Sequence, residues 1–218
     1  MEYATRMSPY AAAVLGALLT VWVAANMARR ELPRGLHLPG IALELATSPT
    51  DVRELRAHAP DVFATGPLTF DSFVVVPVYV LVLCGLGAYV ASLAVPALGA
   101  AIAVCALLAG LFDEIENARL GVVIAASPTA LTEAQVSAAY VASVGKWALL
   151  SVALALLAAG YWMIGDWSRL PAAAFAVSAV LISAGLAASP RLLEWGFGAM
   201  GVALLLAGLP RLVAAVGR

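Results

Sequence analysis

Charged residues are scarce in this 218-residue chain, which contains a single lysine, two histidines and two cysteines. Only 11% of its residues are charged, whereas an ordinary soluble domain has about 25%. At this length a water-soluble fold could not bury 63% hydrophobic residues and still cover itself with polar groups. The scarcity of charge therefore excludes an ordinary soluble domain. The formal net charge of −1 gives no indication of a nucleic-acid partner.

The shortage of histidine and cysteine excludes several kinds of site. His37 and His58 stand alone in a polar stretch and form no haem- or zinc-binding pattern. No hydroxyl or thiol has a histidine at a recognisable spacing, so a nucleophilic triad is unsupported. Cys84 and Cys105 fall inside apolar runs, where we expect free thiols that behave as small apolar residues.

Long apolar runs are what the sequence has in abundance, and its mean hydropathy is +0.98. About 20 apolar residues cross the hydrocarbon core of a bilayer as a helix. The sequence offers about six such spans, at 9–27, 70–92, 97–112, 138–164, 171–188 and 192–209. It therefore predicts one all-α domain over 1–218, a polytopic integral membrane helical bundle. We expect the first span to be a retained transmembrane helix and not a cleaved signal peptide.

A polar stretch between the first two spans predicts one or two short interfacial helices at about 41–60. Ser48, Pro49 and Asp51 form a typical helix start, because serine caps, proline suits the first position and an acid suits the positive helix end. Before the fourth span, Thr132 and Gln135 have the spacing of a capping box. Pro77 lies inside the second span, where it removes one backbone hydrogen bond and should kink that helix.

Ionisable residues within the spans mark the candidate site, because such groups are costly in a membrane. Helical spacing puts Asp113, Glu116, Asn117 and Leu120 on one face of the third span. On the second span, the residues expected to share a face are Asp71, Val75, Val78, Tyr79 and Val82.

Alternating spans bring the polar ends to the same side of the membrane, where they predict one polar layer. We assign catalytic roles to Asp71, Asp113, Glu116 and Lys146, and substrate-binding roles to Glu44, Tyr79 and Asn117. The competing interpretation is ordinary: Asp71 caps its helix, and Lys146 and Arg119 extend to the membrane surface.

Two carboxylates and an amide on one helix face can hold Mg²⁺ through oxygen ligands, which would place a cation at Asp113 and Glu116. The run Asp-Glu-Ile-Glu-Asn matches no signature of diphosphate-binding enzymes closely. We therefore assign no metal ligand and leave the cofactor open.

Two further patterns have a structural interpretation. Gly196-x-Gly198-x-x-Gly201 spells a dinucleotide fingerprint, but it lies within a membrane span and is better explained by close helix packing. Tryptophans near span ends are expected to be interfacial anchors, namely Trp147, Trp162, Trp167 and Trp195.

Three functions remain open at this stage. The leading hypothesis is a small membrane-embedded enzyme that acts on a lipid or isoprenoid-like substrate through the carboxylates. The alternatives are a non-catalytic accessory subunit of a larger membrane complex, and a transporter or ion-handling protein. Expected partners are membrane lipids and a protein partner or second copy on the Ala- and Gly-rich last two helices. We expect the chain in the cell membrane. The bias of its loop arginines favours an orientation with the polar layer on the cytoplasmic side.

Overall fold

The computed structural model describes residues 2–28 and 31–216, which form helices and no strands in those ranges. Six helical segments there are long and apolar enough to cross a membrane, which confirms the all-α polytopic bundle. They are Pro9–Met27, Gly66–Leu93, Pro96–Ala125, Glu133–Ile164, Asp166–Ala187 and Pro190–Leu209.

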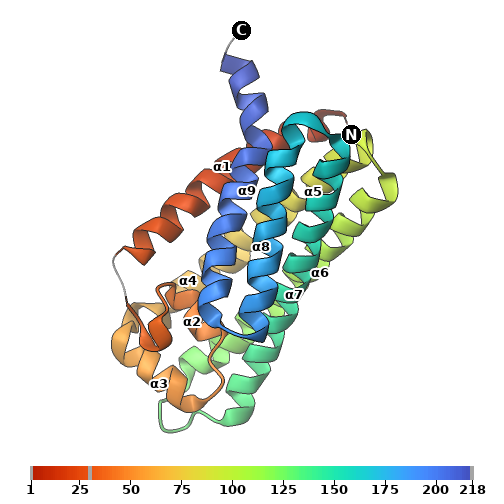
Figure 1. Ribbon diagram of the computed structural model, residues 1–218. Helices are drawn as coiled ribbons and strands as arrows, with labels where there is room; N and C mark the ends of the chain where they lie inside the picture. Colours follow the sequence, from red (N-terminus) through yellow and green to blue (C-terminus); the bar gives the residue numbers. More distant parts are fainter. Residues whose placement is uncertain (1, 29–30, 217–218) are drawn as a thin grey trace.

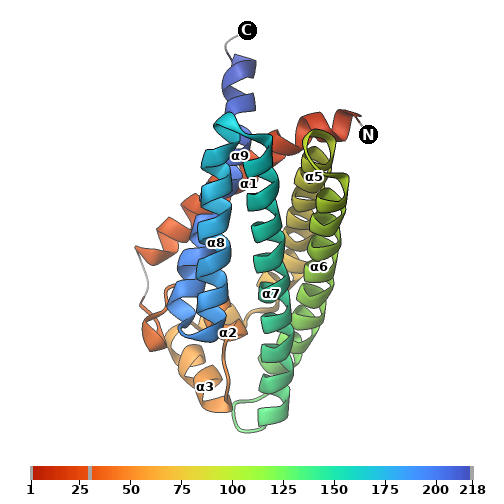
Figure 2. The ribbon, with the colours of Figure 1, turned by 45° about the vertical axis from the view of Figure 1, so that its right-hand side comes forward.

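The long helices form a closed ring (Figures 1 and 2). Each packs against the next in the chain, and the first returns to contact both the last and α5. In ring order they are α5 (Val76–Leu93), α6 (Pro96–Ala125), α7 (Glu133–Ile164), α8 (Arg169–Ala187), α9 (Pro190–Val216) and α1 (Glu2–Met27). The two termini lie at one end of this ring, and the short helices lie at the other.

Glycines let α9 approach its neighbours closely. A side chain at Gly196 would collide with the backbone of α8, and one at Gly201 would collide with Thr20 of α1. The glycine fingerprint in this span is therefore a helix-packing surface, as predicted. Trp162, Trp167 and Trp195 are exposed, as anchors should be.

The polar stretch folds into short helices with apolar residues buried against the ends of α6 and α7. These are η1 (Pro33–Gly35), α2 (Pro39–Glu44), α3 (Pro49–His58) and η2 (Pro60–Phe63). Ser48 caps α3 as predicted, and Asp51 completes a reciprocal cap that was not predicted. Thr132 and Gln135 form the predicted capping box of α7.

Two hydrophobic cores result from this arrangement. The larger lies among the spans and includes Leu86, Leu154 and Phe175. The smaller joins the polar stretch to the far ends of α6 and α7, and it includes Leu43, Leu55, Leu120, Val123 and Val136. In α2, Ile41 belongs to the first core and Leu43 to the second, so this short helix lies at their junction.

The helices of the third and fourth spans extend well beyond the apolar runs that predicted them. The third was expected at 97–112, yet α6 continues to Ala125. The fourth was expected at 138–164, yet α7 begins at Glu133. The added turns bury Leu120 and Val136 in the smaller core, which allows the helices to continue past the end of continuous hydrophobicity.

The second span contains a π turn that ends two residues before Pro77, where the sequence predicted a kink. It consists of α4 (Thr65–Phe70), the π segment η3 (Asp71–Val75) and α5. The amide of Val76 reaches back to the carbonyl of Asp71, one residue further than in an α-helix.

The π turn corrects the face that we expected on this span. Val75 and Val78 are 37% and 40% exposed, whereas Val76 is buried. The extra residue rotates the helix on either side of the turn, so Asp71 and Tyr79 both face α6 while the valines at 75 and 78 face outward.

Candidate functional site

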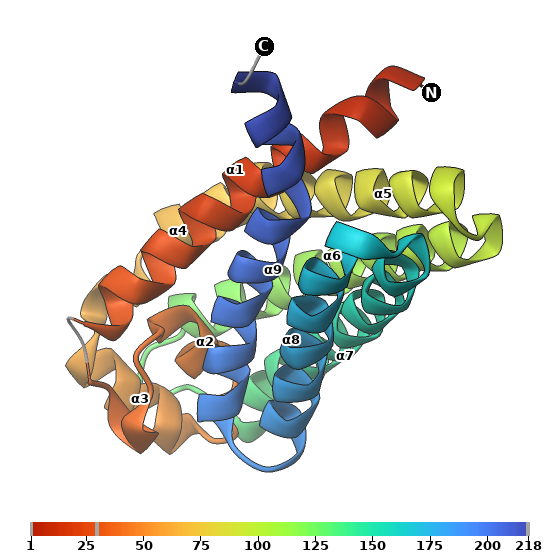
Figure 3. The ribbon, with the colours of Figure 1, turned by 45° about the horizontal axis from the view of Figure 1, so that its top comes forward.

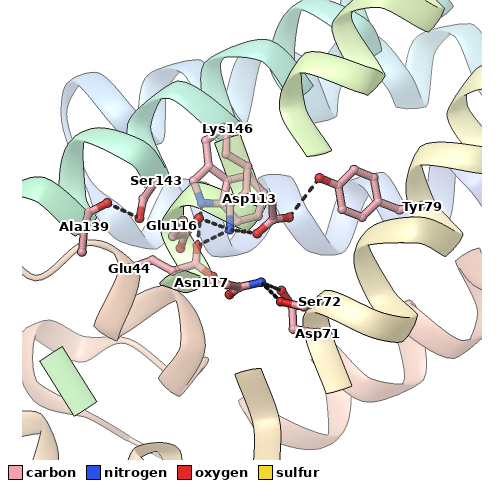
Figure 4. Close-up of polar contacts among 11 residues, drawn as sticks. Glu44, Asp71, Ser72, Tyr79, Asp113, Glu116, Asn117, Ala139, Ser143 and Lys146 are labelled. Carbon is pink, nitrogen blue, oxygen red and sulfur yellow. Dashed lines mark hydrogen bonds and ion pairs between the residues drawn. The ribbon is translucent and has the colours of Figure 1, made fainter. Parts of the chain in front are cut away.

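The single lysine lies at the centre of a buried ionic cluster (Figure 4). The Lys146 ammonium Nζ lies 2.6 Å from Glu116 Oε2, 3.1 Å from Glu44 Oε2 and 3.3 Å from Asp113 Oδ1. Lys146 is only 5% exposed, and it comes from the middle of α7. The expectation that it extends to the membrane surface is therefore wrong.

The predicted face of α6 supplies most of the cluster. Asp113, Glu116, Asn117 and Leu120 are all buried, whereas Glu114 and Arg119 are exposed. The hydroxyl of Tyr79 on α5 donates a hydrogen bond of 2.9 Å to Asp113 Oδ2. Asp113 thus connects the tyrosine to the lysine, using one oxygen for each.

A second group of contacts lies beside the first, on the π turn. The side-chain amide of Asn117 donates to Asp71 Oδ2 at 2.7 Å and to Ser72 Oγ at 3.1 Å. The π geometry turns Asp71 toward α6, so its carboxylate interacts within the bundle. The interpretation of Asp71 as a simple helix cap is wrong, because it lies inside a continuous helical span.

The polar stretch contributes Glu44, at the end of α2. Its Oε2 accepts a hydrogen bond of 2.7 Å from the indole nitrogen of Trp147 and contacts Lys146. Trp147 is 3% exposed, so the prediction that it is an interfacial anchor is wrong. It packs edge-on against Phe197 inside the bundle and positions Glu44.

The cluster holds more acid groups than the lysine can neutralise. Lys146 faces three carboxyl groups, and Asp71 lies nearby. Glu116 is fully buried; its Oε1 has no hydrogen-bond partner, and its Oε2 lies near the ammonium outside hydrogen-bond geometry. The described contacts therefore leave part of the acid character of this cluster without a counter-charge, and unpaired buried charge is very costly.

The geometry does not favour the cation considered at Asp113 and Glu116. The Lys146 ammonium already lies between these two carboxylates. Among the described residues, no group of three or more His, Cys, Asp or Glu side chains has the arrangement to hold a metal ion.

Sequence reasoning missed Glu194, a buried carboxylate in the first turns of α9. Its Oε1 accepts hydrogen bonds from the backbone amides of His37 and Leu38, at 2.8 and 2.6 Å. Its other oxygen lies 3.4 Å from His37 Nδ1. Glu194 thereby fixes the segment that leads into α2, and so it helps to place Glu44.

Two cavities lie away from the ionic cluster. One of about 560 Å³ is lined by the turn between α7 and α8, at the end of the ring where the termini lie. Another of about 340 Å³ lies among α1, α8 and α9, with Glu194 at one edge. Comparison of the chain with protein families, curated proteins and solved structures found no significant match.

Proposed function

We propose that this protein is a small membrane-embedded enzyme that performs acid–base chemistry on a lipid or isoprenoid-like substrate at the ionic cluster. The observation that carries the proposal is the excess of buried carboxyl groups around Lys146. In a site of low polarity, such groups share protons that can be passed to a substrate. Asp113 accepts hydrogen bonds from both Lys146 and Tyr79, and it is the residue that we expect to exchange a proton.

The depth of the cluster supports a lipid substrate. Asp113 follows Pro96 by 17 positions, or about 25 Å along α6. The hydrocarbon core is about 30 Å thick, so with the start of α6 at one boundary we expect the cluster near the other, where lipid headgroups begin. A lipid could therefore present a polar group to the carboxylates while its chain stays in the bilayer.

Access to the cluster follows from the exposure of its members. Glu116 and Lys146 are innermost, whereas the Glu44 side chain keeps 16% exposure and Asp71, Ser72 and Tyr79 are half-buried. We infer that Glu44, Tyr79 and Asn117 contact the substrate, and that Lys146 and Glu116 adjust the charge of Asp113.

We also propose that the protein resides in the cell membrane with the cluster on the cytoplasmic side. The order of the spans in the sequence assigns seven arginines to the side of the short helices and four to the other side. The positive-inside rule then assigns the short helices to the cytoplasm. Arg29, Arg30 and Arg218, which enter this count, lie outside the described residues.

The test is a comparison of membrane lipids in cells that express the chain or its Asp113→Asn variant. Asparagine keeps the size of Asp113 but cannot exchange a proton at neutral pH. We expect untargeted mass spectrometry to find a lipid species that changes with the native chain, and at least about a hundredfold less conversion with the variant. Tyr79→Phe should have a smaller effect in the same direction.

The matched control is Glu114→Gln, which removes an exposed carboxylate from the same helix. It should leave the lipid change intact. Thermal unfolding of each purified variant in detergent separates lost chemistry from lost folding. If no lipid species differs between cells with the native chain and cells with folded Asp113→Asn, the catalytic proposal is wrong and the cluster has a structural role in an accessory subunit or an ion-handling protein.

A further inference from the structure

The cavity among α1, α8 and α9 is an apolar groove, which we call the lateral groove. Its lining includes Ala24 and Met27 of α1, Leu181 of α8, and Trp195, Gly198 and Val202 of α9. At about 340 Å³ it falls within the usual size of a small-molecule site. Trp195 and Val202 are 60% and 40% exposed, so the groove opens toward the surroundings of the bundle.

The groove forms where α1 and α9 separate. A side chain at Gly16 of α1 would collide with the backbone of Gly201, so the two helices touch there. Farther along α1, toward Met27, the contact is looser, and a side chain at Gly198 would meet only the tip of Val23. Figures 1 and 3 show the end of α1 leaving α9 on the side of the short helices. All three lining helices are long and apolar enough to cross a membrane, so we expect the groove to face lipid.

The dimensions of the groove suit a hydrocarbon chain. From Glu194 to Val202 it follows α9 for about 12 Å, given a rise of 1.5 Å per residue. Its Glu194 edge is already satisfied, because that carboxylate accepts two backbone amides. The groove therefore presents an apolar surface to a ligand, and its one carboxylate already has hydrogen-bond partners.

A basic residue, Arg191, lies three positions before the Glu194 end of the groove on α9, and we call this end the mouth. Arg191 precedes Trp195 by four positions and Gly198 by seven, so the three share one face of α9. Arg191 is exposed, and its Nε donates to the carbonyl of Gly35 at 2.8 Å. Arginine in this position binds phosphate with good geometry.

We propose that the lateral groove binds one anionic phospholipid, with an acyl chain along α9 and the phosphate at Arg191. The apolar lining and the opening toward lipid suit an acyl chain, and the basic mouth suits a phosphate. Trp195, exposed between mouth and groove, lies at the level where tryptophan contacts lipid headgroups. The proposal is independent of the chemistry at the ionic cluster.

The experiment is native mass spectrometry of the detergent-solubilised chain with phosphatidylglycerol and phosphatidylcholine of identical acyl chains. We expect one retained lipid and a preference for phosphatidylglycerol. Ala24→Phe should fill the groove and weaken binding of both lipids at least about tenfold, the equivalent of two buried methylene groups. Arg191→Gln should lower the preference for phosphatidylglycerol roughly fivefold and leave chain binding in place.

Matched controls are available on the same helix and on the opposite membrane face. Ala11→Phe adds the same ring at an exposed position of α1 outside the groove, and Arg169→Gln removes an exposed arginine at the other end of the bundle. Both should bind lipid like the native chain. If Ala24→Phe does not fold, Ala199→Phe fills the groove from α9 instead. Equal binding by the groove-filling and control variants, or a second copy of the chain in place of lipid, would overturn the proposal.

Discussion

Lys146 shows how one residue can determine the charge balance of a whole site. Its ammonium contacts carboxylates from two different elements, and it is nearly inaccessible to solvent. An ammonium buried alone would be very unfavourable, and so would the carboxylates without it. The two kinds of charge therefore depend on each other for their burial.

Lys146→Met should lower the free energy of unfolding by about 3–5 kcal/mol, because it leaves several buried carboxylates without a counter-charge. Adding Glu116→Gln should recover part of that loss, since the two side chains interact directly. Thermal unfolding in detergent measures both effects. Arg119→Met, which removes an exposed cation from α6, should change the melting temperature little. A similar loss in the Lys146 and Arg119 variants would show that the ion pairs contribute little.

At the scale of elements, the start of α3 rests on a carboxylate at the edge of the smaller core. Asp51 Oδ2 accepts hydrogen bonds from the backbone and hydroxyl of Thr47, at 2.8 and 2.9 Å. Burial raises the pKa of Asp51, but the bonds from Thr47 and Ser48 and the charge of Arg34 outweigh it, so the pKa lies below its usual 3.8.

Asp51→Asn should cost about 1 kcal/mol at pH 7, because it weakens the reciprocal half of the capping box and removes an acid from the first turn of α3. Because the folded-state pKa is lowered, the ionised carboxylate contributes fully above about pH 4, and its contribution is lost as the pH falls through the folded-state value. The difference in unfolding midpoint between native and variant chains, measured at pH 7 and again near pH 3, should therefore shrink on acidification. A difference that is constant with pH would argue against the charge.

Helical periodicity could predict much of this arrangement at the level of single elements. The face of α6 with Asp113, Glu116 and Asn117 follows from the 3.6-residue repeat alone. The start of α3 follows from residue type, because Ser48 is a good N-cap before a proline. The π turn could not be predicted, because one extra residue in a helix leaves no pattern in an apolar run. Glu194 was missed for a related reason, since its partners are backbone amides that every sequence contains. Trp147 was misplaced because a tryptophan near the end of an apolar run resembles an anchor until its partner Glu44 is known.

At the scale of the whole molecule, the chain has two layers with the ionic cluster between them. The upper layer is a ring of spans around an apolar core, and the lower layer is the short helices packed on the ends of α6 and α7. The cluster is placed by both layers, since Glu44 comes from the lower one and Lys146 from a spanning helix. A fold of this kind couples the placement of the short helices to the charge of the site.

The orientation of these layers is a prediction for the entire molecule. With the short helices in the cytoplasm, both termini lie outside, because the chain crosses the membrane six times. Alkaline phosphatase fused to the C-terminus of the chain should then be active, and a fluorescent protein fused there should be dark. The opposite pair of results would reverse the orientation and place the ionic cluster outside the cell.

The burial of the only lysine also protects its side chain from chemical modification. Amine-reactive probes normally modify many surface sites, but here the side-chain amine is enclosed by carboxylates within the bundle. We expect acylation of that nitrogen only when the two layers separate, so its rate should measure how often the site opens. Because Lys146 is the only lysine and is buried, a lysine-specific protease should cleave the chain only after this part of the fold has opened.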